Sequence, residues 1–448
     1  METAGAMNSV LLLDYYGPES RMLHQSFLAA GYNGPVVVIE DDGFLPDDVI
    51  SVFRSFCGDV SGLEGKPRYF NQVDVPDYWE ISGTGLGGKI TDYTHERGRI
   101  SYREPLNERI VRAVDWLDSS GVVRSTDHYD SHGLLFARTE LSKEGKRFCR
   151  TWFSPEGKEI IVENFATGDI MLLQGGHSSF FRSKTELVIK LFDELGIVPE
   201  RIWYNSLSTP HFVSQSLKAE RKQDVLFWQE GPRNDIPGNM QSILNGTSPR
   251  TAKILVQKRN SYNKLIDLGA DPNVVEPLGF IYPFEKESAG SNEVLICTNS
   301  DQIEKLTELV EALPELHFHV AAVTEMSSKL LDMRKYSNVS LYPAARVDKI
   351  DSLFKRCGIY LDINHQGEII SAVKKAFLHN MLILAFKNTQ HNVTFTPDIH
   401  VYENENDMIS MLRRVHSSPA TLVSHLMMQK QYAMSEDKGK YKELIFAD

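Results

Sequence analysis

Near its amino end the chain alternates short apolar runs with a helical pattern, and this alternation limits the possible folds more than any other feature. Val10 to Leu13 is an uninterrupted apolar run, and Val36 to Ile39 is a second one. Between them apolar residues recur at helical spacing from Met22 to Leu28, and Gly31 ends the pattern. Because a fully apolar strand must be covered on both faces, this order predicts a parallel sheet flanked by helices.

From about Arg68 to Arg182 the pattern changes. Aromatic and β-branched residues alternate with polar ones, and turn signals recur roughly every 8 to 13 residues, which predicts an antiparallel β-meander inserted into the first α/β unit. Such a sheet leaves edges and a second face that need a cover, and a partner protein is one natural cover. The turn signals are Ser119-Ser120-Gly121, Glu144-Gly145-Lys146, Glu156-Gly157-Lys158, Thr167-Gly168-Asp169 and Gly175-Gly176.

After the insertion the α/β pattern resumes, and the polar, small-residue stretch from Glu285 to Asn292 predicts a linker. A second α/β unit begins with a strand from Glu293 to Cys297, and Asp301 with Glu304 predicts a capping box for the next helix. The predicted domains are residues 1–67 with 183–284, the insertion 68–182, and residues 285–448. Further strands are predicted at 201–204, 224–228, 253–256, 316–321, 339–342, 359–361 and 381–385, and helices at 185–195 and beyond residue 407.

Two Rossmann-like halves that face each other across a cleft form the GT-B glycosyltransferase architecture. The predicted fold class is therefore α/β and GT-B-like, with the antiparallel β-meander inserted in the first half. In such folds a sugar nucleotide binds at the carboxyl ends of the strands of the second half. The three C-terminal methionines Met427, Met428 and Met434 are interpreted as packing residues.

Composition excludes several classes of function. The chain has 448 residues and a net charge of −12, which argues against broad binding to nucleic acid or to an anionic membrane, although a local basic patch stays possible. The four cysteines form no CxxC pair, and no apolar run near the amino end is long enough for a signal peptide. These features predict a cytoplasmic protein with reduced thiols. The histidines lack metal-site spacing, so no metal and no cofactor are predicted.

The chemistry of a retaining GT-B enzyme is missing from the second half. Such an enzyme needs acidic residues that hold the donor sugar and the ribose, usually two glutamates eight residues apart. Eight positions after Glu368 lies Ala376, and eight positions before Lys375 lies Gly367, so neither register supplies the pair.

The enzyme also needs cations against the departing diphosphate. The first strand of the second half runs instead into Thr298-Asn299-Ser300-Asp301, where the acid would repel phosphate at the start of a helix. Lys305 is either a substitute cation or a solvated helix lysine.

Several residues suit a neutral sugar or a peptide instead. Asp14-Tyr15-Tyr16-Gly17 follows the first strand, where two tyrosines and an acid favour stacking on a sugar over binding of phosphate. Other polar residues fall at or just after predicted strand ends, where they either bind glycan hydroxyls or satisfy loop backbone groups; His365 and Glu368 are likewise a ligand pair or structural. The candidate acceptor- or sugar-binding residues are Asp14, Tyr15, Tyr16, Asn205, Gln229, Glu230, Asn239, Asn299, His365 and Glu368, with no catalytic residue and no metal ligand.

Eight stretches spread along the chain carry a resemblance to a known family. They are Glu40-Asp41-Asp42-Gly43-Phe44-Leu45-Pro46, Arg68-Tyr69-Phe70-Asn71-Gln72, Val114-Asp115-Trp116, Trp203-Tyr204-Asn205-Ser206, Phe227-Trp228-Gln229-Glu230, Pro237-Gly238-Asn239-Met240, Thr298-Asn299-Ser300-Asp301-Gln302 and Leu361-Asp362-Ile363-Asn364-His365. In this order they resemble the stabilising, GtfB-type subunit of the accessory Sec system O-GlcNAc transferase of streptococci and related bacteria. The resemblance covers nearly everything from Val10 to the C-terminal helices.

The resemblance implies a non-catalytic subunit of a complex that transfers N-acetylglucosamine from UDP-GlcNAc to Ser and Thr of serine-rich repeat adhesins before their export. A homologous catalytic subunit would carry the donor site, in a heterotetramer of two plus two, and the meander would join the subunits. This chain would stabilise its partner and bind the adhesin polypeptide, bare or GlcNAc-modified, at the cytoplasmic face of the membrane. No nucleic acid is expected as a partner.

The sequence leaves two alternative functions open. One is an active retaining GT-B glycosyltransferase with a divergent donor site, in which Lys305, Glu368 and His365 would suffice. The other is a carbohydrate-binding or wall-associated module, which the aromatic hairpins suggest but the two α/β halves and the missing signal peptide oppose.

Overall fold

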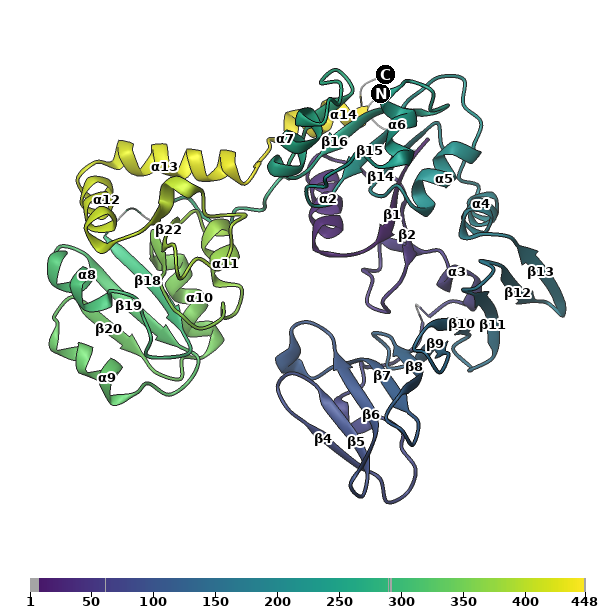
Figure 1. Cartoon of the computed structure of the whole chain (residues 1–448), viewed down its shortest axis with the longest axis horizontal. Coiled ribbons are helices and arrows are strands. Elements are labelled where there is room, and N and C mark those ends of the chain that lie inside the picture. The colour runs from purple at the N-terminus through teal and green to yellow at the C-terminus, as the bar shows by residue number, and fades with distance from the viewer. Residues whose placement is uncertain (1–7, 61, 289, 291, 447–448) are drawn as a thin grey trace. The chain divides into compact units, whose positions relative to one another are not determined.

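The computed structural model describes residues 8–60, 62–288, 290 and 292–446. The chain forms two compact units, each described here by itself. The first unit contains the residues up to Pro277 together with those from Gly439 onward, and the second contains Leu278 to Lys438. Figure 1 labels their elements.

The first unit is built on a parallel seven-stranded sheet in the order β17-β16-β15-β14-β1-β2-β3. Its central strands are buried along their length, as their apolar runs predicted, and the predicted strands at 10–13, 36–39, 201–204, 224–228 and 253–256 are confirmed. The strands are β1 (Ser9–Tyr15), β2 (Val36–Glu40), β3 (Val49–Ser51), β14 (Arg201–Tyr204), β15 (Asp224–Trp228), β16 (Thr251–Val256) and β17 (Val275–Pro277).

Helices flank this sheet. The helix α4 has a complete set of end signals, because the Ser183 side chain accepts a hydrogen bond from the Glu186 N–H and Gly196 ends the helix at a φ of +66°. The helices of the first unit are α2 (Pro18–Ala29), α3 (Arg54–Cys57), α4 (Lys184–Leu195), α5 (Thr209–Ser216), α6 (Gly238–Leu244), α7 (Arg259–Asp267) and α14 (Lys438–Phe446).

The predicted meander is confirmed as a ten-stranded antiparallel sheet whose strands follow one another from β4 to β13. The glycines of the predicted turns, Gly121, Gly145, Gly157 and Gly168, all have positive φ, which side chains other than glycine rarely adopt. The strands are β4 (Glu80–Gly83), β5 (Gly88–Asp92), β6 (His95–Tyr102), β7 (Val111–Leu117), β8 (Val123–Tyr129), β9 (Leu135–Leu141), β10 (Arg147–Phe153), β11 (Glu159–Asn164), β12 (Ile170–Gln174) and β13 (His177–Phe181).

The half of the inserted sheet from β9 to β12 shares the core of the first unit. Trp152 is fully buried and stacks on Phe53 with ring centroids 4.5 Å apart. Lys184 forms ion pairs with Glu40 of β2 and Glu163 of β11, so charge also links the sheet to the Rossmann-like part. The other half packs on a separate small core around Ile90, Ile100, Tyr102, Val111, Val114 and Tyr129.

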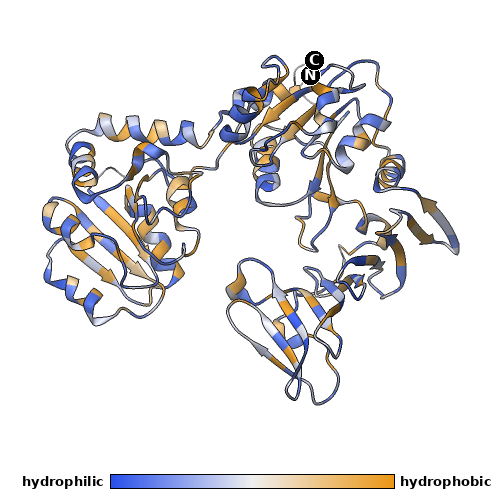
Figure 2. Cartoon of the chain, in the orientation of Figure 1, coloured by the Kyte–Doolittle hydropathy of each residue, from blue (hydrophilic) through white to orange (hydrophobic). Residues whose placement is uncertain are grey.

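The inserted sheet also carries exposed apolar side chains. Figure 2 shows hydrophobic residues on the strands of both Rossmann-like sheets, and also on the inserted sheet. The most exposed large ones on this sheet and its turns are Tyr78, Leu86, Tyr93, Phe148 and Phe180.

The second unit is a parallel six-stranded sheet in the order β20-β19-β18-β21-β22-β23. The predicted strands at 293–297, 316–321, 339–342, 359–361 and 381–385 are confirmed, most with one residue of difference. The strands are β18 (Glu293–Thr298), β19 (His317–Ala322), β20 (Val339–Tyr342), β21 (Ile359–Asp362), β22 (Leu382–Phe386) and β23 (Val401–Tyr402). The main helices are α8 (Leu306–Ala312), α9 (Ser328–Leu331), α10 (Val347–Arg356), α11 (Ala372–Leu378), α12 (Glu405–Ser417) and α13 (Pro419–Tyr432).

The boundary between the units differs from the predicted residue 284. The second unit begins at Leu278 because the first residues of the predicted linker bond to it: the Glu285 N–H donates to the Leu378 carbonyl, and Lys286 Nζ donates to carbonyls at the end of α10. Residues 289 and 291 of that linker lie outside the described residues.

The predicted C-terminal boundary is also wrong, because the final helix belongs to the first unit. Tyr441 of α14 is fully buried there, and its ring lies 5.8 Å from that of Phe27. Of the three methionines interpreted as packing residues, Met434 is buried, whereas Met427 and Met428 on α13 are exposed.

The predicted capping box is wrong. The helix α8 begins only at Leu306, and its cap position is Lys305 at a φ of +53° with no side-chain cap. Asp301 instead accepts a hydrogen bond from Ser327, and Glu304 pairs with His365. The acids bond to neighbouring loops rather than to the helix start.

Candidate functional site

Three amide side chains form a chain of hydrogen bonds at the carboxyl edge of the first sheet. Asn205, Gln229 and Gln257 directly follow β14, β15 and β16, and the carboxyl ends of neighbouring parallel strands meet at one edge. Asn205 Nδ2 donates to Gln229 Oε1 at 3.1 Å, and Gln229 Nε2 donates to Gln257 Oε1 at 2.7 Å. Asn205 Oδ1 also accepts from the Asp14 N–H at 2.8 Å, so these buried amides position the loops of the edge.

Tyr15 is the last residue of β1, directly after Asp14, and 52% of its surface is exposed. Its ring lies along the loop, since a Cβ atom at Gly17 would come within 2.7 Å of it. Partial burial raises the pKa of Tyr15, and the nearby carboxylates of Glu19, Asp14 and Glu230 raise it further. An exposed ring among carboxylates suits the hydroxyls of a neutral sugar and repels phosphate.

Asp14 is half-buried beside Tyr15. Burial raises the pKa of its carboxyl group, while a hydrogen bond with Ser206 lowers it. The charges of Glu40 and Lys184, at the junction with the inserted sheet, also act on this carboxyl group. Asp14 and Tyr15 are therefore a polar and accessible part of the predicted site.

Tyr16 has a different environment from Tyr15. Its hydroxyl shares a hydrogen bond with His24 Nδ1 at 2.8 Å, and burial raises the pKa of Tyr16 to about 12. It lines a pocket of about 470 Å³ between the loop after β2 and the inserted sheet. Tyr16 therefore follows Tyr15 in the chain and is itself part of the lining of this pocket.

Two further predicted residues have local partners. Glu230 is exposed and pairs with Arg233 at 3.0 Å. Asn239 does not lie just after a strand end, as predicted, but within α6, where Nδ2 donates to the Leu207 carbonyl at 3.1 Å. This bond ties α6 to the loop after β14.

The carboxyl edge of the second sheet is closed by its own side chains. The buried Asp362 accepts from the His391 N–H at 2.8 Å and pairs with His391 Nδ1 at 2.5 Å. His391 Nε2 lies 2.6 Å from the Gln366 carbonyl oxygen. The hydrogen bond to Asp362 raises the pKa of His391 and so favours the protonated ring, the form that has N–H donors for both oxygens.

Asn364 joins the loop after β21 to the turn after β18. Its Oδ1 accepts from the Thr298 hydroxyl at 2.8 Å, and its Nδ2 donates to the Gln366 carbonyl at 3.0 Å. The candidate Asn299 accepts from the same Nδ2 at a longer distance of 3.4 Å. The two loops where a donor nucleotide would lie therefore bond to each other.

The other two candidates of the second unit are also engaged. His365 Nε2 lies 2.5 Å from a carboxylate oxygen of Glu304. Glu368 accepts from the Val373 N–H at 2.9 Å near the start of α11, and desolvation raises its pKa. Both contacts fix loop positions.

Lys305 does not form a phosphate clamp. Its Nζ lies 3.4 Å from Glu308 and 3.8 Å from Glu405, which neutralise its charge. Asp301 and Glu304 precede it, so a diphosphate at the start of α8 would meet carboxylates. In the part of the chain that the structure describes, no group of three or more His, Cys, Asp or Glu residues could hold a metal ion.

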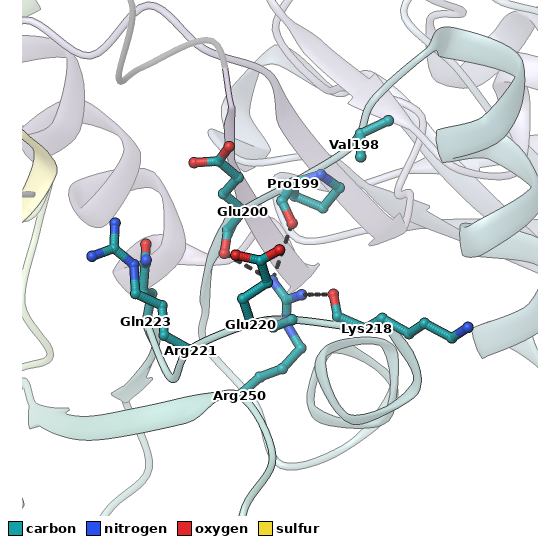
Figure 3. Close-up of a pocket in the computed structure, with 9 residues that line it drawn as sticks. Val198, Pro199, Glu200, Lys218, Glu220, Arg221, Gln223 and Arg250 are labelled. Carbon is teal, nitrogen blue, oxygen red and sulfur yellow. Dashed lines mark hydrogen bonds between the residues drawn. The ribbon is translucent and has the colours of Figure 1, made fainter.

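A larger pocket, of about 560 Å³, lies at the opposite edge of the first sheet (Figure 3). Its central residue, Arg250, is buried and paired with Asp224 at 2.8 Å. The rest of the guanidinium donates to the carbonyls of Lys218, Pro199 and Glu200. Its donors are thus used by the protein, and Arg250 ties the loops before β14 and β15 together.

Sequence reasoning missed Gln257, His391 and the arginines of the Tyr16 pocket. Gln257 follows a predicted strand just as Asn205 and Gln229 do, so the same rule would have found it. His391 lies far along the chain from Asp362, and only the folded loops bring them together.

Two Rossmann-like units with a sheet inserted in the first define a glycosyltransferase-like chain of the GT-B class. Family models match it in four segments: the GtfB N-terminal domain at residues 10–56, the GtfB middle domain at 79–182, the GtfB third domain at 184–268 and the GftB/GlyA-F C-terminal domain at 294–429. The chain belongs to the GtfB family, as the relatives below also show.

One relative is the UDP-N-acetylglucosamine–peptide N-acetylglucosaminyltransferase stabilizing protein GtfB of Streptococcus agalactiae, 40% identical over 97% of this chain and 98% of its own length. The protein of the same name from Streptococcus gordonii is 39% identical with the same coverage. A chain in the crystal structure of the GtfA/B complex bound to UDP and GlcNAc is 40% identical, with a TM-score of 0.88 over 97% of this chain and 98% of that one. The two relatives from Streptococcus agalactiae and Streptococcus gordonii are named as stabilising proteins rather than as the transferase.

Proposed function

We propose that this chain is the non-catalytic, stabilising and acceptor-binding subunit of a two-subunit enzyme that transfers GlcNAc from UDP-GlcNAc to Ser and Thr residues of a polypeptide. The observation that carries the proposal is the contrast between the two carboxyl edges. The edge of the second sheet is closed by Asp362, His391 and Asn364, whereas the edge of the first presents the exposed Tyr15. The names of the relatives, which are stabilising proteins of a transferase, support a non-catalytic role beside a catalytic subunit.

The homologous catalytic subunit is the proposed partner, and the inserted sheet is the proposed contact. The strands β4 and β13 are the edges of this sheet, so each leaves backbone groups on one side for another strand. Tyr78 and Tyr93 lie in the region of β4 to β6, and Phe180 lies on β13; all three rings are more than 70% exposed. A partner that covered them would gain apolar contact.

The finer parts of the proposal follow the family resemblance. The acceptor is a serine-rich repeat adhesin, bare or already GlcNAc-modified, handled before export by the accessory Sec system. The complex is a heterotetramer of two plus two in the cytoplasm, associated peripherally with the membrane. No helix among the described residues is long and apolar enough to cross a membrane.

Surface substitutions test the partner contact better than removal of the sheet, because Trp152 and Phe53 bury each other and deletion would expose the first core. Tyr78→Ser with Tyr93→Ser, and separately Phe180→Ser, should reduce co-elution with the co-expressed catalytic subunit. Val423→Ser, at a 53% exposed residue of the second unit, is the matched control. Co-elution equal to wild type in both interface variants would exclude the inserted sheet as the contact.

A further inference from the structure

The pocket that Tyr16 lines contains arginine side chains, whereas the charged groups around Tyr15 are carboxylates. The residues that line it include Asp42 and Phe44 of the loop after β2, Arg103 and Arg112 of the inserted domain, and Arg21 of α2. All of these residues belong to the first unit. The pocket encloses about 470 Å³, which is enough for an amino-acid side chain and part of its backbone.

The side chain of Arg103 is held in place, but its hydrogen-bond donors have no acceptor among the described residues. It is half-buried, and its guanidinium carbon lies 4.9 Å from the centre of the Phe44 ring. Stacking of this kind fixes the plane of the guanidinium and leaves its N–H donors, which lie in that plane, free for a carboxylate. Among the described residues, no hydrogen bond or ion pair engages the side chains of Arg103 and Arg112. Arg103 is therefore a half-buried guanidinium without an acceptor in the described part of the protein, which favours a ligand that supplies one, and the exposed Arg112 adds a second unpaired cation.

The charge of the pocket limits the kind of anion. Arg21, Arg103 and Arg112 are three cations, whereas Asp42 and Glu104 are two carboxylates that line the same pocket. The excess of one positive charge suits a single carboxylate, and the two acids would repel a diphosphate. Asp42 Oδ1 also accepts from the Phe44 N–H at 3.0 Å, so this carboxylate fixes the loop that lines the pocket.

We propose that this pocket binds a carboxylate side chain of the acceptor polypeptide through Arg103 and Arg112, while the surface around Tyr15 binds the Ser, Thr or sugar part. The inference rests on the proposed acceptor-binding function and deepens it by naming a peptide feature that the chain recognises. Tyr15 and Tyr16 are neighbours in the chain, so one short extended peptide can reach both places.

The test is a titration of the full chain with two Ser/Thr-rich peptides that differ only by Glu in place of Gln. The Glu peptide should bind wild type about tenfold more tightly, as expected for one bidentate arginine–carboxylate contact. Arg103→Gln or Arg112→Gln should remove most of this preference and leave the affinity for the Gln peptide unchanged. Arg103→Lys, which keeps the charge but not the planar fork, should retain only part of it.

Arg147→Gln is the matched control. Arg147 also stacks on an aromatic ring of the inserted sheet, 4.7 Å from the centre of Phe165, but does not line the pocket. It should keep the full preference for the Glu peptide. Melting temperatures of all variants, compared with wild type, check that each substitution leaves the fold intact.

The outcomes separate the two proposals. Equal affinity of wild type for the Glu and Gln peptides would overturn the carboxylate pocket while leaving acceptor binding intact. Binding of neither peptide would overturn acceptor binding itself, and the pocket inference with it. Competition by free glutamate as strong as by the Glu peptide would also overturn the inference, because the pocket would then take small anions and not a peptide.

Discussion

The two parallel sheets of this chain share an architecture but use their carboxyl edges in opposite ways. At the first edge the polar side chains Asn205 and Gln229 are buried and bond to each other, whereas Tyr15 at the end of β1 is exposed. At the second edge Asp362, His391 and Asn364 bond the loops together over the place where a nucleotide would bind. The comparison teaches that the fold supplies the edge, and that the hydrogen bonds already made there decide whether it can take a ligand.

The largest effect should come from breaking the support of the first edge. Asn205→Ala leaves the Asp14 N–H without its acceptor and Gln229 Oε1 with only the longer contact from the Ser20 hydroxyl at 3.4 Å, and should lower the free energy of unfolding by about 3 kcal/mol. The five tryptophans all lie in the first unit, at positions 79, 116, 152, 203 and 228, so tryptophan fluorescence during urea unfolding reports that unit alone.

Asn239→Ala is the control for this prediction. Among the described residues its side-chain amide makes one hydrogen bond, to the Leu207 carbonyl, and its loss should cost no more than about 1 kcal/mol. Equal destabilisation by the two substitutions would show that the hydrogen-bonded side-chain amides at the first edge contribute no extra stability.

The second prediction concerns the closed edge and its pH dependence. Asp362 raises the pKa of His391 above its ordinary value of 6.5. The stabilisation is therefore complete below pH 6.5 and disappears as the pH rises through the raised pKa, since a neutral ring has a single N–H and cannot donate to both oxygens. His391→Gln should speed hydrogen exchange of residues 363–371 about tenfold at pH 6, relative to wild type.

Near pH 9 the ratio of the two exchange rates should approach one, because the neutral His391 ring of wild type no longer donates to both oxygens. A ratio that stayed constant between pH 6 and pH 9 would mean that the loop is held by neutral contacts. Comparing the variants as ratios at each pH removes the intrinsic pH dependence of exchange.

A third, smaller effect should appear at the exposed ring of the first edge. Tyr15→Ala removes a stacking surface and should weaken binding of a GlcNAc-bearing Ser/Thr peptide about fivefold, with little change in stability. Tyr93→Ala, at an 85% exposed residue of the inserted sheet, should leave peptide affinity of the isolated chain unchanged. The same affinity loss in both variants would remove Tyr15 from the site.

The smallest effect is expected at Lys305. It is partly exposed and already paired with Glu308 and Glu405, so Lys305→Ala should change neither peptide affinity nor activity of the assembled complex. Transferase activity of the complex provides the measurement. A marked loss would revive the alternative of an active donor site in this chain.

The sequence predicts the parallel sheets well because most of their strands contain continuous apolar runs. The strands at 201–204 and 224–228 match the prediction residue for residue, whereas the three-residue strands β3 and β17 are too short to show a pattern. The capping box at Asp301 fails because the acid has a tertiary partner, Ser327, which a local motif does not reveal.

The site is predicted in part for the same reasons. Strand ends locate Asn205 and Gln229, but their burial depends on how the amides meet across neighbouring strands. The stacking of Arg103 on Phe44 joins the inserted sheet to the loop after β2, and no periodicity in the sequence predicts that contact. Local patterns give strand ends; the partners of polar side chains come from tertiary structure.

The most direct test of the central claim is calorimetry of the isolated chain with two ligands in parallel. We predict saturable binding of a GlcNAc-bearing Ser/Thr peptide, weakened by Tyr15→Ala, and no heat of binding with UDP-GlcNAc. Saturable binding of UDP-GlcNAc, with none of the peptide, would contradict the account and place a working donor site in this chain.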